Sequence, residues 1–521
     1  MKRGLLILFS GNMETFHPVG LVSVLILAVY LFLSKIFTKR TNFPPGPGGL
    51  FLLGSAHKLP LQYQEKTFSK WGKQYGDVIY LRLFRTPTIV LNSFQAATDL
   101  LTKRSATYSD RPRMILLGEL MDQASALPPM PYGDRFRKHR RWMHDAVGSR
   151  ERLATLRSVQ LSGARKLLRN LLRTPEQFVE HLQLYVAATM LEVTYGKQIT
   201  SMNDELAEVA DRAIDGINAA GSPGSRIVDF FPILKELPIW MPGAGFKRRA
   251  LGVGRYVRAW KETGYRVVKA ALARGDAIPC VTAALLREIG DTSTPEDEED
   301  IKGLGCSLYG AGTETTLGMI SAFMLAAMRN PEAGRKAQEE IDRRVGKERL
   351  PDFGDRASLP YLNAFLEELY RWACPLPLSL PHRAMAADEY RGYTIPEGSM
   401  VMPNIWAMSR DEDAYPEPEE FHPERHLNKV RDGSNPLPSG YVFGFGRRVC
   451  PGQAFADATL WIAMAGIMAS FDVRPPLNAE GVEVCPPAAF RPGFTRQPEK
   501  YTCRIIPRSG KMAKLVSEVD V

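Results

Sequence analysis

A glycine-rich loop near the C-terminal end, residues 443–452 with the sequence FGFGRRVCPG, constrains this chain more than any other stretch. Its one cysteine, Cys450, follows two arginines and precedes an apolar segment. Gly444, Gly446 and Gly452 permit tight turns, which expose backbone N–H groups to the sulfur. A thiolate persists as a metal ligand only in such an electropositive, water-poor setting. The loop therefore predicts a cysteine that faces a buried metal centre, although most single cysteines are small core residues.

The spacing F-x-x-G-x-R-x-C-x-G in this loop resembles the haem-binding loop of the cytochrome P450 superfamily, the haem-thiolate monooxygenases. From average residue usage, such a match arises by chance on the order of once in 10⁴ chains of this length. The resemblance implies that Cys450 is the axial ligand of the iron of haem b and that Phe443 and Arg448 help to bind the cofactor. It also implies a mainly α fold with small β-sheets.

The N-terminal region predicts a membrane anchor. Residues 19–37 are almost wholly apolar apart from Lys35, whose long side chain can reach the membrane surface, and they are long enough for one transmembrane helix. Lys39 and Arg40 follow, which favours a cytosolic body. The alternative is a cleaved signal peptide, but no small-x-small cleavage site follows. We expect a single-pass protein of the endoplasmic reticulum whose catalytic domain faces the cytosol.

The chain then divides into four segments. An N-terminal extension covers residues 1–18, and Met13 within it opens a more ordinary anchor sequence and is a possible true start. The anchor is followed by a basic, Pro- and Gly-rich hinge at residues 38–50, and the haem-thiolate catalytic domain covers residues 51–521.

Composition narrows the functional classes. The six cysteines contain no C-x-x-C pair, which argues against a zinc ribbon or a secreted disulfide scaffold. The net charge of +10 favours anionic partners, but charge alone does not choose among nucleic acid, acidic lipid and an acidic protein surface.

A long apolar run at residues 301–328 predicts a helix. It follows an acidic start and stops at Asn330 and Pro331, as a helix should. Its internal glycines and threonines, together with Glu314, indicate a helix buried in protein and not a second membrane span.

The middle of this helix carries the second chemical motif, Ala311-Gly312-Thr313-Glu314-Thr315. The Thr315 hydroxyl can bond the Ala311 carbonyl one turn back, which opens the helix locally, and Gly312 leaves room beside it. The resembled family has A/G-G-x-D/E-T here, across the haem from the cysteine. The resemblance implies an oxygen groove at Ala311 and Gly312, with catalytic Thr315 hydrogen-bonding dioxygen and catalytic Glu314 relaying protons. The alternative is a polar stripe on a core helix.

A third motif lies at Glu367-Glu368-Leu369-Tyr370-Arg371. Glu367 and Arg371 are four apart and could form an ordinary surface pair. The family implies instead a buried structural triad of Glu368, Arg371 and Arg425. The family usually has phenylalanine directly after that last arginine, whereas this chain has His426, which leaves the packing there open.

Basic residues form the remaining cofactor candidates. Residues 135–141 are dense in Lys and Arg, which taken alone indicates a solvated helix face or a nucleic-acid patch. Phe136 and Arg140 share one helix face. The family has Trp-x-x-x-Arg there, so only Arg140 carries over as a propionate contact, and either His382 or Arg383 provides another. Three further basic residues would then face an acidic redox partner: Arg137, Lys138 and Arg141.

Outside these motifs, the sequence predicts strands and helices. Residues 76–81 and 88–92 predict two strands of a sheet that recurs at residues 393–396 and 401–402. The period of the middle third, residues 149–300, is mostly helical.

Three segments are expected to line the pocket: residues 105–131, 221–246 and 490–494. Within the second, the apolar stretch 227–240 is followed by basic residues, so it suits either a loop that dips into a membrane surface or a core helix pair. Residues 240–247 resemble a stretch of fungal microsomal members of the family.

The resemblance implies a monooxygenase that inserts one oxygen atom of O₂ into an apolar small molecule, in secondary metabolism of terpenoids or polyketides or in xenobiotic oxidation. We expect electrons from a separate NADPH-dependent flavoprotein reductase, because the residues after Cys450 are too few for flavin and nicotinamide domains. Membrane lipid is an expected partner and nucleic acid is not. The alternatives are a haem-thiolate isomerase or dehydratase that does not use O₂, and a basic membrane-tethered binding protein.

Overall fold

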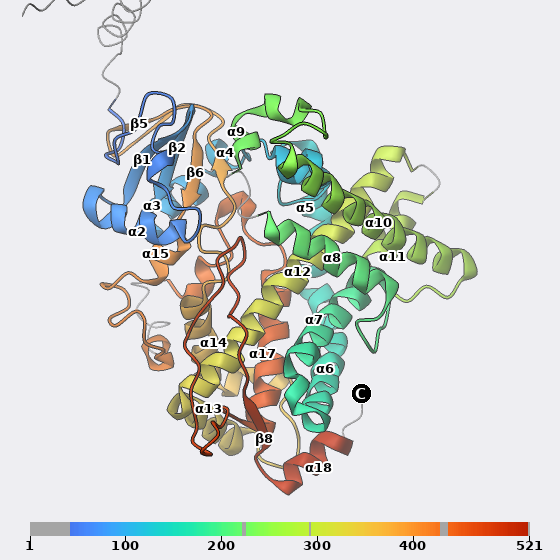
Figure 1. Ribbon diagram of the computed structural model, residues 1–521. Coiled ribbons are helices and arrows are strands. Elements are labelled where there is room, and N and C mark those ends of the chain that lie inside the picture. Colours follow the sequence, from blue (N-terminus) through green and yellow to red (C-terminus); the bar gives the residue numbers. More distant parts are fainter. Residues whose placement is uncertain (1–41, 221–225, 291–292, 428–435, 519–521) are drawn as a thin grey trace, which may run out of the picture.

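The computed structural model describes residues 42–220, 226–290, 293–427 and 436–518, in which a large helical body adjoins a smaller sheet region (Figure 1). This confirms the mainly α fold with small β-sheets. The expected anchor at residues 19–37, the extension that contains Met13, the first four hinge residues and residues 221–225 lie outside the described residues. Within the described ranges, no helix is both long enough and apolar enough to cross a membrane.

Long helices form most of the body and confirm the helical middle third. They are α5 (Asp134–Val147), α6 (Arg150–Arg173), α7 (Phe178–Tyr195), α8 (Glu205–Ala219), α10 (Gly245–Arg274), α12 (Pro295–Arg329), α13 (Pro331–Arg344), α14 (Pro360–Ala373) and α17 (Gln453–Ser470). Shorter helices connect them: α2 (Gln64–Tyr75), α3 (Phe94–Ala97), α4 (Ser105–Tyr108), α9 (Ile227–Phe230), α11 (Val281–Ile289), α15 (Ile405–Ser409) and α18 (Gly510–Glu518).

Helix α12 is the central element and runs through the body (Figure 1). Thr294 and Asp297 form a reciprocal capping box at its start, and Pro295 occupies the first turn, where no intrahelical N–H is needed. It ends before Asn330 and Pro331, as the sequence predicts. Helices α7, α10, α14 and α17 pack around it, which explains why its apolar residues are not confined to one face.

The main sheet joins distant parts of the chain. Strands β1 (Val78–Leu83) and β2 (Thr86–Leu91) are antiparallel, β6 (Met400–Pro403) runs parallel to β2, and β3 (His382–Arg383) completes the edge. Two further pairs are β4 (Asp388–Tyr390) with β5 (Tyr393–Ile395) and β7 (Phe471–Arg474) with β8 (Arg504–Pro507).

The predicted recurrence of the sheet is therefore right for residues 401–402 and wrong for residues 393–396. The latter belong to a separate hairpin, in which Tyr390 pairs with Tyr393. Arg391 and Gly392 between them both have positive φ, 53° and 78°, which is the geometry of a two-residue hairpin turn.

The stretch 227–240 is not a core helix pair. It contains only the short α9 and a single 3₁₀ turn at Pro232–Glu236, and Ile233 and Trp240 are 74% and 77% exposed. Phe230 packs its ring against Phe84 at 5.3 Å, which attaches this segment to the sheet region. The membrane-loop alternative is the one that agrees with this exposure.

The basic run of α5 packs against the start of α12. Arg135 Nε lies 2.6 Å from Asp300 Oδ1, and Lys138 Nζ contacts both Asp297 and Asp300. Burial alone would raise the pKa of Asp300, but hydrogen bonds from His139, Lys138 and Arg135 hold it well below its usual range. The expectation that Lys138 faces a redox partner is wrong, because its charge is used within the chain.

Candidate active site

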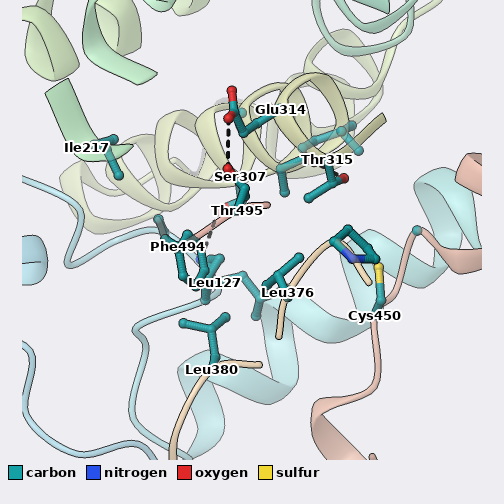
Figure 2. A pocket seen from close by; sticks show the side chains of 18 of the residues that line it. Leu127, Ile217, Ser307, Glu314, Thr315, Leu376, Leu380, Cys450, Phe494 and Thr495 are labelled. Carbon is teal, nitrogen blue, oxygen red and sulfur yellow. Dashed lines mark hydrogen bonds between the residues drawn. The ribbon is translucent and has the colours of Figure 1, made fainter. Parts of the chain in front are cut away.

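A cavity of about 350 Å³ lies between the Cys450 loop and α12 (Figure 2). Most of its lining is apolar. It brings together eight of the sequence-predicted residues: Ala311, Gly312, Glu314 and Thr315 from α12, His382 from β3, and Phe443, Arg448 and Cys450 from the loop. Motifs far apart in the chain thus share one enclosed space.

The Cys450 loop owes its shape to two of its glycines. Gly444 and Gly446 have φ of 84° and 54°, a region that side chains other than glycine rarely adopt. A Cβ on Gly446 would lie 2.0 Å from the carbonyl oxygen of Leu101, so the loop also approaches the backbone of a neighbouring segment. Gly452 differs, because its φ is −93° and no left-handed turn requires it.

The sulfur of Cys450 lies at the closed end of this loop. The backbone N–H of Cys450 donates to the Phe443 carbonyl at 2.8 Å, and this hydrogen bond connects the two ends of the loop. Burial raises the pKa of the Cys450 thiol, while the backbone N–H of Gly452 and the charge of Arg140 lower it. The thiolate is thus unfavourable unless a cation, such as a metal, compensates its charge.

Helix α12 lines the cavity with the predicted Ala311–Thr315 motif, within a continuous α-helix. Thr315 Oγ1 donates to the Ala311 carbonyl at 2.8 Å, as its sequence position predicts. Glu314 Oε1 accepts a hydrogen bond from Thr495 Oγ1 at 2.8 Å (Figure 2) and another from Gln497 Nε2 at 2.5 Å. Burial raises the pKa of the Glu314 carboxyl, so it holds a proton more readily than a surface glutamate does.

Two buried guanidinium groups lie beside the cavity without a hydrogen-bonded carboxylate in the described part of the chain. Arg448 donates through Nε and Nη2 to the carbonyls of Ser109 and Met130, and its Nη1 is buried with no partner. Arg111 donates to the carbonyls of Pro128, Leu380 and Pro381. Burial, and secondly the charge of Arg448, lower the pKa of Arg111, and burial lowers that of Arg448 to about 10.

These two arginines fit the propionates of a haem. Uncompensated buried charges are costly, and a bound carboxylate would both neutralise them and accept the free Nη1–H of Arg448. Arg111 did not stand out in the sequence, although residues 105–131 are an expected pocket segment. It lies in irregular chain, where no periodicity shows that an arginine is buried.

The structure separates His382 from Arg383. His382 is 2% exposed and lies on the cavity wall, with Nδ1 2.8 Å from the Tyr108 carbonyl. Burial and the charge of Arg111 hold its pKa well below the usual range, so the ring is neutral. Arg383 lies outside the cavity lining and pairs with Asp110 at 2.9 Å.

Arg140 also lies outside the cavity lining. Its Nη1 donates to the Val449 carbonyl at 2.6 Å, directly beside Cys450. It lines a second hollow on the other side of the loop, which Cys450 and Pro451 also line. In this structure Arg140 therefore supports the loop from behind.

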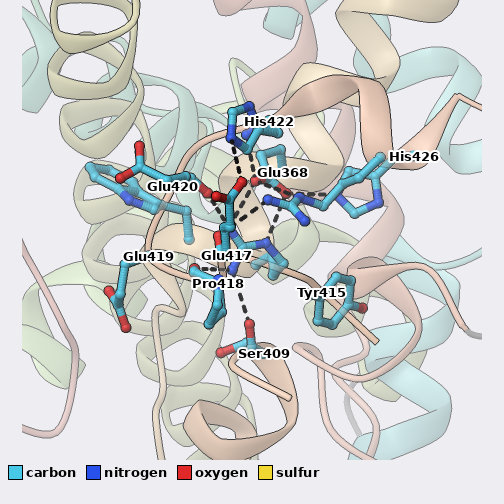
Figure 3. A network of polar contacts seen from close by, with 12 residues as sticks. Glu368, Ser409, Tyr415, Glu417, Pro418, Glu419, Glu420, His422 and His426 are labelled. Atoms are coloured by element: carbon cyan, nitrogen blue, oxygen red, sulfur yellow. Dashed lines mark hydrogen bonds and ion pairs between the residues drawn. The ribbon is translucent and has the colours of Figure 1, made fainter. Parts of the chain in front are cut away.

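Behind the cavity, Glu368, Arg371 and Arg425 lie together in a buried network (Figure 3). Arg371 donates to both carboxylate oxygens of Glu368 at 2.8 Å, and Arg425 Nε lies 3.1 Å from one of them. His426 is a fourth member, with Nε2 2.8 Å from Glu368 Oε2. The surface-pair alternative is wrong, because Glu367 accepts hydrogen bonds from Ser439 instead.

The histidine that departs from the family pattern thus replaces a packing contact by a polar one. Burial alone would raise the pKa of Glu368, but hydrogen bonds from Arg371 and His426 lower it to about 2. Arg371 also donates to the carbonyls of Ser409, Pro418 and Glu420, so the network holds the segment that leads towards the Cys450 loop.

Comparison with known proteins agrees with this geometry. The family model of cytochrome P450 matches residues 44–504. Cytochrome P450 monooxygenase 136 of Postia placenta is 41% identical over 92% of this chain and 92% of its own length. Cytochrome P450 monooxygenase COX2 of Coprinopsis cinerea is 38% identical over 98% of this chain and 97% of its own length. Tryptamine 4-monooxygenase of Psilocybe cyanescens is 36% identical over 95% of this chain and 99% of its own length. The chain therefore belongs to the cytochrome P450 family of monooxygenases, and this membership implies a haem-iron cofactor.

Proposed function

We propose that this enzyme inserts one oxygen atom of O₂ into an apolar small molecule and reduces the other to water, with electrons from a separate NADPH-dependent flavoprotein reductase. One observation carries the proposal: a single cavity has Cys450 on one wall and, on another, the turn of α12 in which Thr315 donates a hydrogen bond to the Ala311 carbonyl. Packing alone does not explain why the Cys450 thiol and the Thr315 hydroxyl line the same cavity.

In this proposal the chain binds haem b. Cys450 ligates the iron, and Arg448 and Arg111 bind the propionates. His382 joins them only as an imidazolium, because its Nδ1–H already donates to the Tyr108 carbonyl and Nε2 needs a proton to donate to a carboxylate. The cofactor supplies the activation of dioxygen when it is bound. The Thr315 hydroxyl donates a hydrogen bond to the Ala311 carbonyl. The lone pairs of Thr315 Oγ1 therefore remain to accept a hydrogen bond in the cavity.

Glu314 is the proton relay of this proposal. Burial raises the pKa of its carboxyl, so Glu314 takes up a proton more readily than a surface glutamate does. Thr495 and Gln497 donate hydrogen bonds to its carboxyl from the C-terminal segment and so fix its position. Glu314→Gln tests this role, since it keeps the hydrogen-bonding shape and removes the titration.

The substrate of this proposal is apolar because the cavity is. Leucine and other apolar side chains dominate its walls, and they exclude water from the reacting region. Those that Figure 2 labels are Leu127, Ile217, Leu376, Leu380 and Phe494. Together with the fungal relatives, one of which is named for a small-molecule substrate, this favours secondary metabolism of a terpenoid or polyketide, or xenobiotic oxidation.

The membrane part of the proposal places residues 19–37 across the endoplasmic reticulum membrane and one end of the catalytic body against its cytosolic surface. Phe51 and Leu52 are 62% and 72% exposed, and Arg82 holds the backbone of this segment through the carbonyls of Leu50 and Phe51. The same sheet region carries the exposed stretch 227–240 through Phe230. Apolar groups exposed this far favour contact with lipid.

The carbon monoxide difference spectrum of the reduced protein tests the central claim. We expect a Soret band at the red-shifted position typical of thiolate ligation, and Cys450→Ser should abolish it. Cys485→Ser is the matched control, because Cys485 is exposed and is not among the residues that line the cavity. A wild-type protein without this band would falsify the proposal. Incorporation of isotopically labelled O₂ into product separates it from an isomerase or dehydratase.

A further inference from the structure

One wall of the cavity is an irregular segment, residues 120–127, between the short turn Ile115–Leu120 and α5. Four of its side chains line the cavity: Met121, Gln123, Ala126 and Leu127. Irregular backbone lacks the regular hydrogen bonds of a helix or sheet. Its N–H and C=O groups therefore need partners in neighbouring elements, and these partners fix its position. The shape of this part of the cavity is therefore decided by contacts outside the cavity.

The segment lies directly on the backbones of two helices. A Cβ on Gly303 of α12 would come within 2.2 Å of the Ser125 carbonyl oxygen, and one on Gly254 of α10 within 2.8 Å of the Leu120 carbonyl oxygen. Any larger residue at either position would push the wall into the cavity. Gly303 and Gly254 thus allow residues 120–127 to pack directly against α12 and α10, away from the cavity.

Lys261 of α10 holds the segment from behind. Its side chain is 3% exposed, and its Nζ donates to the Asp122 carbonyl at 2.7 Å and lies 3.2 Å from Asp122 Oδ2. Asp122 has a φ of 61°, a strained conformation for a residue with a side chain. Arg258 Nη1 stands farther away, 4.0 Å from Asp122 Oδ1.

The same ammonium group ties the segment to α12. Lys261 Nζ lies 2.7 Å from Glu299 Oε1, which also accepts a hydrogen bond from Ser125 Oγ at 2.7 Å. Ser307 Oγ of α12 accepts from the Leu127 N–H at 2.9 Å (Figure 2). Burial alone would raise the pKa of Glu299, but Lys261 and Ser125 lower it, so the contact is between opposite charges.

We propose that Lys261 is a positioning residue for substrate selection: it fixes the wall at residues 120–127 and thereby decides whether bulky substrates bind, without itself touching them. Lys261 is not part of the cavity lining. Small ligands that contact only the turn of α12 between Ala311 and Thr315 do not contact this wall, whereas large ligands do. The inference rests on the proposed function, because it assumes that the cavity binds the substrate beside a haem.

Two azoles of different size test the inference on the full-length holoenzyme. Imidazole and miconazole both coordinate a haem iron through nitrogen, but only the second is large enough to fill the cavity. If Lys261→Met leaves the wall in its competent position about one tenth of the time, the Kd of miconazole rises about tenfold while that of imidazole changes less than about twofold. The carbon monoxide band should stay unchanged.

Lys269→Met is the matched control. Lys269 lies on the same helix and pairs with Glu298, next in sequence to Glu299, but its side chain is 61% exposed. We expect both azole affinities to stay at wild-type values. Amide hydrogen exchange of the peptide that covers residues 115–130 should speed up in Lys261→Met and not in Lys269→Met.

The outcomes separate the two proposals. A wild-type protein without the carbon monoxide band would remove the proposed function itself. Unchanged miconazole affinity in Lys261→Met, or an equal loss for both azoles, would overturn only the inference. If Lys261→Met yields no holoenzyme, Glu299→Gln decides, because it keeps an acceptor for Ser125 but removes the charge opposite Lys261. We expect a smaller rise for miconazole, about threefold, and no rise would equally overturn the inference.

Discussion

The carboxylate of Glu368 shows how strongly one buried charge can depend on its partners. It is fully buried, and two guanidinium groups, an imidazole and the backbone N–H of His422 surround it. Removing one partner of such a cluster leaves an uncompensated charge, which typically costs about 3–5 kcal/mol. The network is therefore more sensitive to single substitutions than its distance from the cavity suggests.

This cluster predicts an acid-sensitive stability. The folded pKa of Glu368 is lowered to about 2 from an ordinary value of 4.5. A lowered carboxyl pKa contributes stability that is fully present above about pH 5 and is lost as the pH falls towards about 2. Glu368→Gln should therefore lower the free energy of unfolding at neutral pH. Between about pH 5 and pH 3, the free energy of unfolding of this variant should fall less than that of the wild type.

Urea unfolding followed by tryptophan fluorescence at several pH values measures this. Glu412→Gln is the control, because Glu412 is exposed and pairs with Lys73 at the surface. The prediction fails if Glu368→Gln and wild type lose the same stability on acidification.

The two adjacent candidates for a propionate contact make a second prediction at this scale. His382→Phe removes a polar ring from the cavity wall, whereas Arg383→Leu removes a charge that already pairs with Asp110. We expect His382→Phe to speed haem loss about tenfold, the usual effect of losing one hydrogen bond to a charged group. Arg383→Leu should have little effect. Transfer of haem to apomyoglobin gives both rates, and faster loss from the Arg383 variant would reverse the assignment.

At the scale of elements, the Cys450 loop depends on glycine for two independent reasons at one position. Gly446 combines a positive φ with a backbone neighbour 2.0 Å from the place of a Cβ, and a backbone oxygen cannot move aside as a flexible side chain can. Gly444 has a positive φ too, but its nearest such neighbour is 3.8 Å away.

Gly446→Ala should therefore disrupt the loop and prevent stoichiometric haem binding. Gly440→Ala, a few residues earlier, places its Cβ at an ordinary 3.6 Å from Pro436 and is the matched control. The Soret absorbance per protein measures haem content for both variants. Full haem content in Gly446→Ala would contradict this account of the loop.

At the scale of the whole molecule, two groups of exposed apolar side chains belong to the sheet region: residues 50–53, which precede β1, and the stretch 227–240, which Phe230 attaches to Phe84. We predict that a chain beginning at Asn42 still binds phospholipid vesicles, and that replacing Ile233 and Trp240 together by serine reduces the bound fraction about tenfold or more. Vesicle flotation measures this binding.

The control uses exposed apolar residues elsewhere. Val179 and Val482 are 46% and 58% exposed, and Val179 follows Phe178, which packs on Tyr501 near β8, at the end opposite α9 in Figure 1. Their double serine variant should bind as wild type does. Equal binding by both double variants would show that lipid does not contact the stretch 227–240.

The sequence was most informative where chemistry requires a fixed local spacing. The cysteine loop, the Thr315 to Ala311 hydrogen bond and the neighbours Glu368 and Arg371 are all properties of a few consecutive residues. Asn330 and Pro331 likewise gave the C-terminal end of α12, whereas the helix begins at Pro295, before the apolar run that starts at residue 301. Such features need no knowledge of what lies across the fold.

The rest depends on tertiary contacts that no local pattern encodes. Arg111 and Lys261 lie in a loop and on a helix rich in basic residues, and only their neighbours show that they are buried. The sequence around His426 does not show what the imidazole packs against, because its partner, Glu368, lies far away in the chain. Arg383 and Lys138 resemble their neighbours in sequence, but an acidic residue across the fold binds each of them.

The Cys450 loop is thin. Cys450 and Pro451 line the main cavity on one side and the hollow beside Arg140 on the other, so the sulfur stands in a partition about one residue thick. Electron tunnelling falls steeply with distance, and a donor bound in that hollow would need no relay of intermediate redox groups. In the proposed function, electrons would thus enter from the Arg140 side of the loop, while the substrate and O₂ would occupy the cavity on its other side.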